Sequence, residues 1–299
     1  MPMRPRLSGV GPSRYVRPEG PCVSARRLAW STNAERRVTE AGTGDLDISE
    51  RSGAAATIER PDGAGRWLLV CDHASNRLPA RFGSLGLDAT DLIRHFAWDP
   101  GARGIARRMA ERLDAALVLS TVSRLVIDCN RLPSDPDSIV AVGETTPVPG
   151  NAAIDAAERE RRVAEAYTPY HEAIEAALGR RLTQPGPVVL CAVHTFTPVM
   201  RGVARPWHVG IVHHPDDALA DRIIAILSRE PGLVVGDNEP YAPADRVYHT
   251  LDRHGTARGL ATVMIEVRND LVTTDEEERR WGDRLAAALD EALAALPGA

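Results

Sequence analysis

The stretch Trp67–Pro79, with the sequence WLLVCDHASNRLP, is a short apolar run that turns polar abruptly. Its first five residues are apolar, and Asp72 and His73 follow directly. An apolar run bounded by polar and turn-forming residues predicts a buried β-strand that ends in a loop. In open α/β sheets, ligands bind beyond the carboxyl ends of such strands. We therefore expect His73 to lie at the functional edge of a sheet.

Polar side chains also follow or interrupt three later apolar runs. These runs are Leu125–Asp128, which precedes Asn130 and Arg131, Pro187–Val193, which precedes His194, and Ala261–Val267, which contains Glu266. Each run is short and rich in branched side chains, which favours a buried strand. When such strands share one sheet, polar groups at their carboxyl ends meet at one edge. The sequence therefore predicts a site assembled from segments that are far apart along the chain.

Segments with a helical spacing of apolar residues separate these runs. A helix is expected to start at Pro100, because proline suits the first turn after a capping residue such as Asp99. Pro169 is expected to kink or split the long helix predicted over residues 155–181. Further strands and helices are predicted over residues 116–121, 207–213, 216–228, 233–235 and 275–296. This alternation predicts an α/β layered fold with a mostly parallel or mixed central sheet.

Three stretches lack a persistent apolar pattern. Residues 1–58 are rich in Arg, Gly, Pro and Ser, and we predict a tail that is disordered or loosely docked. Residues 59–299 then form a single domain. Leu132–Asn151 is a long loop, and loops of this length are uncommon unless they cover a site. Asn238–His254 is predicted to be irregular.

Charge and cysteine spacing exclude several classes of protein. The 299 residues carry a net charge of −5, which argues against a nucleic-acid-binding protein. No apolar run approaches the roughly 18 residues of a membrane-spanning helix, and the N-terminus lacks the apolar core of a secretory signal. Cys71, Cys129 and Cys191 lie in or beside apolar runs, which is typical of buried thiols in a reducing compartment. We therefore expect a cytoplasmic protein, and the sequence leaves its oligomeric state open.

Two histidines at strand ends suit a metal site. Neutral imidazole is a good ligand for Zn²⁺, and a catalytic zinc site has three protein ligands and one open position. His73 and His194 supply two of these ligands, and we take Asp99 as the third because it lies at the same edge. Asn76 and Asp72 remain alternatives. The amide of Asn76 binds metals weakly, and Asp72 would have to point away from its neighbour His73.

The remaining polar groups suit the hydrolysis of an amide next to a carboxylate. Glu266 is the candidate general base, since a carboxylate near the metal takes a proton from water and returns it to the leaving amine. Arg131 suits a two-point contact with a substrate carboxylate, with help from Asn130. Arg268 lies two residues after Glu266, so both are expected on one face of a strand. Together these residues predict metal-assisted hydrolysis.

Structural roles are the alternatives for these residues. A lone histidine is more often a hydrogen-bonded structural or surface residue than a ligand. His213 and His214 compete as metal ligands, but adjacent residues on a strand face opposite ways. Because a buried carboxylate is costly without a partner, Glu266 would in this interpretation form an ion pair with Arg268 or Arg124.

Four motifs, CDHASNRLP, SRLVIDCNR, AVHTF and MIEVRND, occur in this order along the chain. In order and separation they resemble the N-formylglutamate amidohydrolase family from about Trp67 to Asp270 and into the last helix. That family looks distantly related to zinc carboxypeptidases and to the succinylglutamate and aspartoacyl hydrolases. The resemblance implies a three-layer α/β/α domain of the phosphorylase/hydrolase-like type. It also implies a Zn²⁺ ion that activates water against an N-acyl amide.

The resemblance also implies roles for single residues: metal binding by His73 and His194, contact with the substrate carboxylate by Asn130 and Arg131, and catalysis by Glu266. The sequence departs from the wider group at Asn76, where that group has a glutamate three residues after the first histidine. The motif CDHAS also lacks the proline that precedes the histidine in the best-studied branch. These departures indicate a side branch with a different acyl or amino-acid preference.

We therefore expect a Zn²⁺-dependent amidohydrolase that acts on a small N-formyl or N-acyl amino acid. The expected substrate is N-formylglutamate, which would yield glutamate and formate. One alternative is a related zinc deacylase or carboxypeptidase-like hydrolase of another substrate. The other is a metal-free protein that binds a small carboxylate on the same fold. Neither nucleic acid nor a membrane is expected as a partner.

Overall fold

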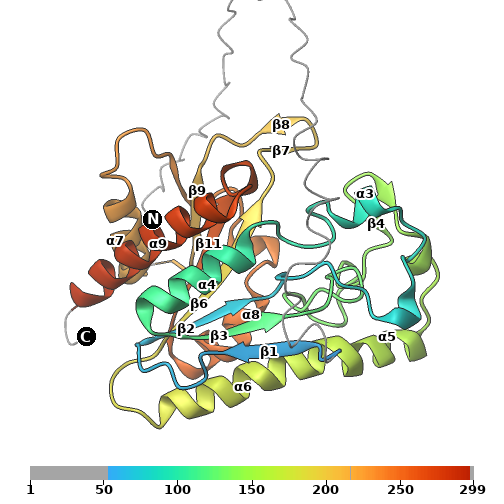
Figure 1. The fold of residues 1–299 in the computed structure, drawn as a ribbon, viewed down its shortest axis with the longest axis horizontal. Helices are drawn as coiled ribbons and strands as arrows, with labels where there is room; N and C mark the ends of the chain where they lie inside the picture. Colours follow the sequence, from blue (N-terminus) through green and yellow to red (C-terminus); the bar gives the residue numbers. More distant parts are fainter. Residues whose placement is uncertain (1–52, 216, 297–299) are drawn as a thin grey trace, which may run out of the picture. The chain divides into compact units, whose positions relative to one another are not determined.

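The computed structural model describes residues 53–215 and 217–296, and most of the predicted tail at residues 1–58 lies outside these ranges. Its central element is a seven-stranded sheet in the order β1-β3-β2-β6-β11-β9-β10 (Figure 1). The strands are β1 (Ala56–Glu59), β2 (Trp67–Cys71), β3 (Ala116–Ser120), β6 (Val189–Phe196), β9 (Val209–Val212), β10 (Val235–Asp237) and β11 (Ala261–Arg268). β1 is antiparallel to β3 and β9 is antiparallel to β11, whereas the other neighbours are parallel.

Helices cover both faces of this sheet. One face packs against α4 (Ala102–Leu113), α7 (Ala218–Leu227) and α9 (Asp275–Ala294), and the other against α6 (Thr168–Leu182) and α8 (His249–His254) (Figure 1). In β2, Trp67 and Leu69 belong to the first core, and Leu68 and Val70 to the second. Burial on both faces explains why the strands are continuously apolar. The predicted α/β/α fold with a mixed sheet is confirmed.

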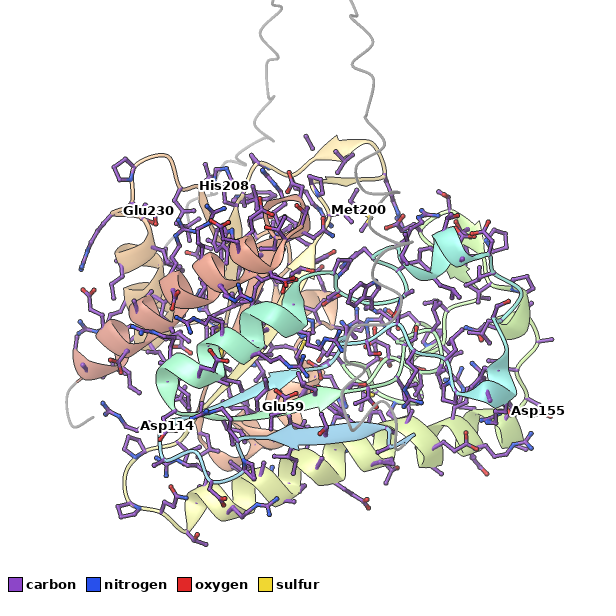
Figure 2. All side chains as sticks on the ribbon, in the orientation of Figure 1. Glu59, Asp114, Asp155, Met200, His208 and Glu230 are labelled. Carbon is purple, nitrogen blue, oxygen red and sulfur yellow. The ribbon has the colours of Figure 1, made fainter. Side chains whose placement is uncertain are left out.

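Capping side chains fix the start of several helices. Asp217 accepts hydrogen bonds from the backbone N–H groups of Leu219 and Ala220 at the start of α7. Thr274 caps α9 in the same way. Asp155, labelled in Figure 2, accepts from the first turn of α5 (Ala156–Arg162). These contacts satisfy N–H groups that have no partner within the helix.

Two proline-containing segments show how the chain enters or interrupts a helix. α4 begins at Ala102 rather than at Pro100, because Gly101 first takes a left-handed conformation with φ of 85°, which glycine adopts without a steric cost. The helix predicted over residues 155–181 is interrupted just before Pro169 by a π-helical turn at Val163–Tyr167, which separates α5 from α6. Proline has no N–H to donate to the preceding turn, so the helix widens there. The predicted interruption is confirmed.

The segment after β3 differs most from the sequence prediction. Leu125–Asp128 is not a strand but part of an irregular segment, in which the Val126 N–H donates to Ser123 O (3.0 Å). Its apolar side chains are nevertheless buried, and Leu125 lies in one small core with Phe96. Burial alone does not define a backbone conformation. The strand prediction was wrong here because a short apolar run also suits a buried turn.

Other elements are longer or more ordered than predicted. β6 continues through His194 to Phe196, and β1 begins at Ala56, within the segment predicted as a tail. The loop 132–151 contains a small hairpin of β4 (Val142–Gly143) and β5 (Thr146–Pro147). The stretch 238–254, predicted to be irregular, ends in α8.

Several short elements complete the described part of the chain. They are α3 (Ala89–Leu92), the hairpin of β7 (Val199–Met200) and β8 (Val203–Ala204), and 3-10 turns at Ala80–Phe82, Pro149–Asn151, Pro243–Asp245, Thr256–Arg258 and Asn269–Leu271. Met200 on the β7–β8 hairpin is labelled in Figure 2. Within residues 53–215 and 217–296, no helix has both the length and the apolar character needed to cross a bilayer.

Candidate active site

Polar groups from four separate segments meet at the carboxyl ends of β2, β6 and β11. His73 follows β2 closely, whereas His194 and Glu266 lie within the last residues of β6 and β11. Glu266 and His194 are register partners in the parallel ladder, so both side chains leave the same face of the sheet. Asp99 comes from the loop before α4, where its N–H donates to His73 O (3.0 Å). The fold therefore places these four side chains in one cluster.

His73, His194 and Asp99 bring three potential metal ligands together. Asp99 Oδ2 lies 3.2 Å from His73 Nδ1 and 2.8 Å from His194 Nδ1. The two imidazole rings have centroids 4.9 Å apart and meet edge to face. One ligand atom from each residue lies within 4.8 Å of the others, and all three residues are buried. Two imidazoles and one carboxylate are a donor set that binds zinc in catalytic sites.

The outer nitrogen of each imidazole faces a further buried carboxylate. His73 Nε2 lies 2.8 Å from Asp128 Oδ1, and His194 Nε2 lies 2.9 Å from Asp72 Oδ2. The hydroxyl of Thr250 donates to Asp72 Oδ1. Metal-binding histidines commonly donate their second N–H to a carboxylate, which fixes the ring and its tautomer. This orientation leaves both Nδ1 atoms facing Asp99.

The buried charged groups in the cluster shift one another's pKa values. Burial acts to lower the pKa of His194, but hydrogen bonds to Asp72 and Asp99 outweigh it and raise this pKa well above its usual value. Burial also acts to lower the pKa of His73, and the carboxylates of Asp128 and Asp99 raise it overall. Burial acts to raise the pKa of Asp72, but contact with His194 brings it down to about 2. The carboxylates therefore favour positive charge at both imidazoles.

Glu266 differs from the other carboxylates in the cluster. It is 5% exposed, and its Oε2 has no hydrogen-bond partner among the described residues. Burial raises its pKa to about 7, although the nearby charge of His194 acts in the opposite direction. A buried acid that titrates near neutral pH is suited to take up and release a proton. Among the described residues Glu266 forms no ion pair with Arg268 or Arg124, which pair with Asp270 and Asp128 instead.

Asn130 and Arg131 lie beside the cluster but also hold neighbouring loops. The Asn130 amide donates to Val247 O, and its oxygen accepts from the Thr250 N–H (3.0 Å). Arg131 donates to Arg246 O (2.7 Å). Asn130 is therefore engaged at both ends of its amide. Arg131 also lines the cavity beside the cluster, and its Nε lies 3.5 Å from Asp137 Oδ2.

Arg268 does not reach this cluster. Its guanidinium donates to Asp270 (2.8 Å) and to the carbonyl groups of residues 205–207 at 3.3–3.4 Å. Strand alternation placed Arg268 on the face of Glu266, but β11 ends at Arg268 and the long side chain turns toward the adjacent loop. Its position therefore indicates a structural contact with that loop.

The cluster opens into a small cavity of about 80 Å³. Its lining residues are His73, His95, Asp99, Arg124, Asn130, Arg131, His194, Thr195, Tyr241, Val247 and Glu266. A neighbouring cavity of about 280 Å³ shares four of these side chains with it, namely His95, Arg124, Arg131 and Tyr241. The predicted residues at this cavity are His73, His194, Asp99, Glu266, Asn130 and Arg131, and Arg268 lies elsewhere.

The structure also separates the alternatives for the third ligand. Asp72 points to the outer nitrogen of His194, away from the two Nδ1 atoms. Asn76 donates to Leu92 O (2.9 Å) and does not line the cavity. Asp99 is the carboxylate that lies between the two imidazoles. The cluster therefore favours Asp99 over both alternatives.

Sequence reasoning did not assign functional roles to several residues at the site. Asp128 contacts both His73 and Arg124, with Arg124 Nε 3.1 Å from Asp128 Oδ2. The sequence signal that could have found Asp128 is its place at the end of the apolar run Leu125–Asp128. His95 and Tyr241 lie in segments without any motif, and nothing in the sequence singled them out.

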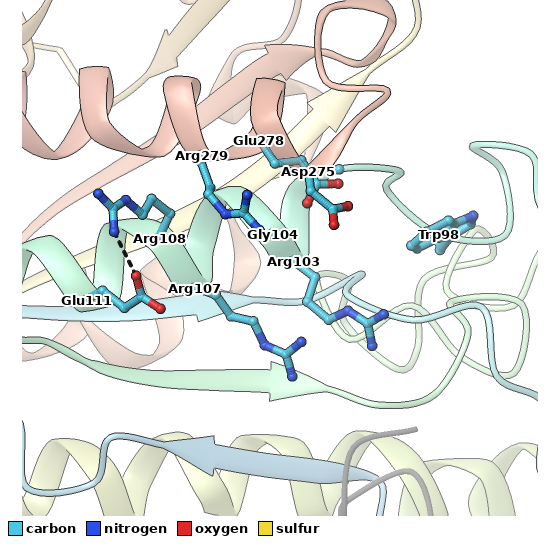
Figure 3. Close-up of a pocket in the computed structure, with 10 residues that line it drawn as sticks. Trp98, Arg103, Gly104, Arg107, Arg108, Glu111, Asp275, Glu278 and Arg279 are labelled. Carbon is cyan, nitrogen blue, oxygen red and sulfur yellow. Dashed lines mark hydrogen bonds and ion pairs between the residues drawn. The ribbon is translucent and has the colours of Figure 1, made fainter. Parts of the chain in front are cut away.

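A larger cavity of about 380 Å³ lies between α4 and α9 (Figure 3). Figure 3 shows charged side chains from both helices around it. Arg108 is paired there with Glu111 (3.0 Å), and it also contacts Asp283. Its lining residues include neither a histidine nor a cysteine. The chemistry of the small cavity, rather than its size, therefore identifies the candidate active site.

The chain is similar to known proteins over the region that builds this site. A model of the N-formylglutamate amidohydrolase family matches residues 65–273. A crystal structure of a gene product from Agrobacterium tumefaciens has 40% sequence identity and a TM-score of 0.79, and the match covers 82% of this chain and 97% of that one. The crystal structure of N-formylglutamate amidohydrolase from Ralstonia eutropha has 20% identity and a TM-score of 0.56, with 81% and 98% covered. None of the curated proteins matches the chain.

Proposed function

Because this chain belongs to the N-formylglutamate amidohydrolase family and is a hydrolase of non-peptide carbon–nitrogen bonds, we propose that it hydrolyses an N-formyl or N-acyl amino acid in a metal-dependent reaction. The preferred substrate in this proposal is N-formylglutamate, which would yield glutamate and formate. The observation that carries the proposal is the convergence of His73 Nδ1 and His194 Nδ1 on Asp99, beside the unpartnered acid of Glu266.

His73, His194 and Asp99 would hold the ion, and Zn²⁺ fits this donor set. A bound divalent ion would supply positive charge that activates water and polarises the amide carbonyl. Asp128 and Asp72 accept from the outer nitrogens of the two rings, so each imidazole would present its Nδ1 lone pair inward once the Nδ1 proton is lost. The protein therefore fixes the ligands before the ion binds.

Glu266 would move the proton in this reaction. As a carboxylate it accepts a proton from the attacking water, and as an acid it then donates that proton to the leaving amine. Its position opposite His194 brings it close to the proposed ligands, and burial raises its pKa to about 7, near neutral pH. The proton thus stays within the cavity from attack to product release.

Arg131 would bind the substrate carboxylate from the wall of the cavity. A guanidinium can make two parallel hydrogen bonds to a carboxylate, which fixes the orientation of the amino-acid part. Asn130 would act mainly by holding the loop at Val247 in place. The cavity of about 80 Å³ beside the acid suits a small acyl group such as formyl.

A panel of N-formyl and N-acetyl amino acids, assayed with and without a chelator, tests the proposal. We expect hydrolysis of N-formylglutamate, loss of activity on chelation and recovery on adding zinc. Activity that persists in metal-free protein would refute the metal dependence. Stoichiometric zinc with turnover of a different acyl amino acid would assign the protein to another substrate. Protein without zinc or turnover that still binds small carboxylates would favour the metal-free binding protein.

A further inference from the structure

Two buried histidines behind the active site form a continuous chain of hydrogen bonds. His171 Nε2 lies 3.0 Å from Cys129 O, and His171 Nδ1 lies 2.7 Å from His254 Nε2. His254 Nδ1 lies 2.9 Å from Glu175 Oε1. The two rings stack with an interplanar angle of 18°, and the exposed fractions of His171 and His254 are 2% and 0%. The chain therefore runs from a half-exposed acid on α6 to a backbone carbonyl.

The number of protons in this chain follows from the atoms at its ends. A carbonyl oxygen and a carboxylate oxygen both accept hydrogen bonds. The three contacts therefore need three N–H groups, one for each contact, whereas two neutral imidazoles carry only two. With two protons, one contact would bring a nitrogen lone pair against another acceptor. The geometry therefore favours one proton beyond two neutral imidazoles, balanced by Glu175.

Charged and titratable groups on the surrounding elements bear on this extra proton. They are Glu175, Tyr167 and Tyr170 on the α6 side, His249 and Arg253 on α8, Arg258 after α8, and Asp72 at the sheet edge. Burial lowers the pKa of His171 to about 3 and that of His254 to about 4, so burial opposes a third proton, whereas the carboxylate of Glu175 favours it. Arg258 also binds Glu175, with distances of 2.8 Å to both oxygens. Glu175 is therefore the anion that would balance a third proton on the pair.

The carbonyl at the inner end of the chain belongs to the segment that orients a proposed metal ligand. Cys129 lies between Asp128, which contacts His73 Nε2, and Asn130, which contacts the Thr250 N–H. A shift of Cys129 would move the Asp128 carboxylate away from His73. α8 holds this segment directly through Thr250 and indirectly through His254, which contacts His171 on α6.

We infer that His171 and His254 form a positioning pair with three ring protons, which holds the Asp128–Asn130 segment and so orients His73. The positioning role depends on the proposed metal-dependent function. The proton count does not depend on it, because it concerns the histidine pair alone. The two parts of the inference therefore need separate measurements.

Nitrogen-15 spectra of the histidine rings in the full-length protein, with and without zinc, test the proton count. At pH 6 and 7 we expect three protonated ring nitrogens in the pair. Glu175→Gln should lower the pH at which the third proton leaves by at least one unit, since it removes the balancing charge. Glu172→Gln, on the exposed side of α6, is the matched control and should leave the spectra unchanged. Two protons at both pH values in the wild type would overturn the inference.

Zinc affinity tests the positioning role without any substrate. His171→Leu cannot donate to Cys129 O, and we expect zinc to bind about 10-fold more weakly or worse. His171→Gln keeps an amide donor and should recover most of the affinity, which separates positioning from a general loss of folding. Equal affinity in the Leu variant and the wild type would overturn the positioning role. A wild type that binds no zinc would instead refute the proposed function and leave the proton count standing.

Discussion

Glu266 lies directly opposite His194 in the parallel ladder between β11 and β6, and both side chains leave the same face of the sheet. Every other carboxylate of the cluster is held by an imidazole: Asp72 by His194, Asp128 by His73, and Asp99 by both. Glu266 Oε2 has no such partner in the described part of the chain. The arrangement separates carboxylates that orient ligands from one that can exchange a proton.

Substitution of Glu266 by Gln should separate catalysis from metal binding. Glu266→Gln keeps the size of the side chain and removes its ability to accept a proton. We expect kcat to fall by about 10²–10⁴-fold, while zinc content measured by metal analysis stays at the wild-type level. Asp270→Asn is the control, because Asp270 pairs with Arg268 outside the cavity. A Gln variant with near-normal turnover would assign the base to another residue.

The pH dependence of kcat/KM in the wild type should reflect the titration of Glu266. Burial raises the pKa of Glu266 to about 7 in the absence of a metal ion, and a bound cation lowers it. Below this pKa Glu266 is protonated and cannot act as a base, so kcat/KM should rise tenfold per pH unit up to a midpoint at or below about pH 7. The rise should be missing from Glu266→Gln. A wild-type profile that is flat from pH 5 to 8 would contradict this assignment.

Removal of any one of the three proposed ligands should abolish stoichiometric zinc. We expect this for His73→Ala, His194→Ala and Asp99→Asn, because a catalytic site depends on all three protein ligands. Asn76→Ala should retain zinc, since Asn76 binds Leu92 O instead. His214→Ala controls for the loss of a histidine near the sheet, as His214 pairs with Asp252. Zinc retained in Asp99→Asn but lost in Asn76→Ala would reverse the choice of third ligand.

The carboxylates behind the imidazoles should matter less than the ligands but still measurably. Asp128→Asn and Asp72→Asn remove the charge that orients His73 and His194, and we expect zinc affinity to fall about 10- to 100-fold in each. Thr250→Val removes only one hydrogen bond to Asp72 and should have a smaller effect than Asp72→Asn. Competition with a zinc-binding dye measures all three variants. Wild-type affinity in both Asn variants would mean that packing alone fixes the rings.

The sequence indicated this candidate site because the ends of buried strands can be recognised from apolar runs, and parallel strands end at the same edge of a sheet. His73, His194 and Glu266 each occur at the end of an apolar run, and the parallel ladder places such ends at one edge. Asp128 was harder to assign, because its neighbours Leu125–Ile127 form a buried turn rather than a strand. Strand periodicity gives the face that a residue occupies but not the direction of a long side chain. The turn of Arg268 toward the adjacent loop could therefore not be predicted.

Contacts between segments far apart along the chain could not be predicted from the sequence. The pairing of His171 with His254 joins two helices through residues 83 positions apart, and neither helix carries a motif that marks it. His95 and Tyr241 reach the cavity from segments whose conformation depends on the packing of other loops. Such positions follow from tertiary packing, which local patterns of hydrophobicity do not encode.

Zinc binding should release two protons from the metal-free protein. Carboxylates raise the pKa of both His73 and His194, and each ring must lose its Nδ1 proton before it can bind a metal. The apparent affinity should therefore fall about 100-fold for each pH unit below these pKa values. Calorimetry in buffers with different ionisation enthalpies counts the protons. Release of fewer than one proton at pH 6 would show that the imidazoles are already neutral.

The same shifts predict how the stability of the metal-free protein depends on pH. Because the folded state raises the pKa of His73 and His194, their contribution to the free energy of unfolding is complete below the unfolded value near 6.5 and is lost as pH rises through the folded values. Thermal unfolding of the chelated protein should show this decrease, and His194→Gln should reduce it. Added zinc should restore stability at high pH, because the ion replaces the lost positive charge.

Arg131 should determine affinity for the substrate carboxylate rather than the rate of bond cleavage. Arg131→Met removes a charged hydrogen-bond donor from the cavity wall, and we expect KM for N-formylglutamate to rise about 10- to 100-fold with a smaller change in kcat. Arg131→Lys should be intermediate, since an ammonium group cannot make two parallel bonds. A substrate whose α-carboxylate is replaced by an amide should bind the wild type weakly and be insensitive to Arg131→Met. Arg229→Met serves as the control because its guanidinium pairs with Glu291 and it does not line the cavity. If the amide substrate loses as much affinity in Arg131→Met as N-formylglutamate does, Arg131 acts through the Arg246 carbonyl and the loop it holds, and another group must bind the carboxylate.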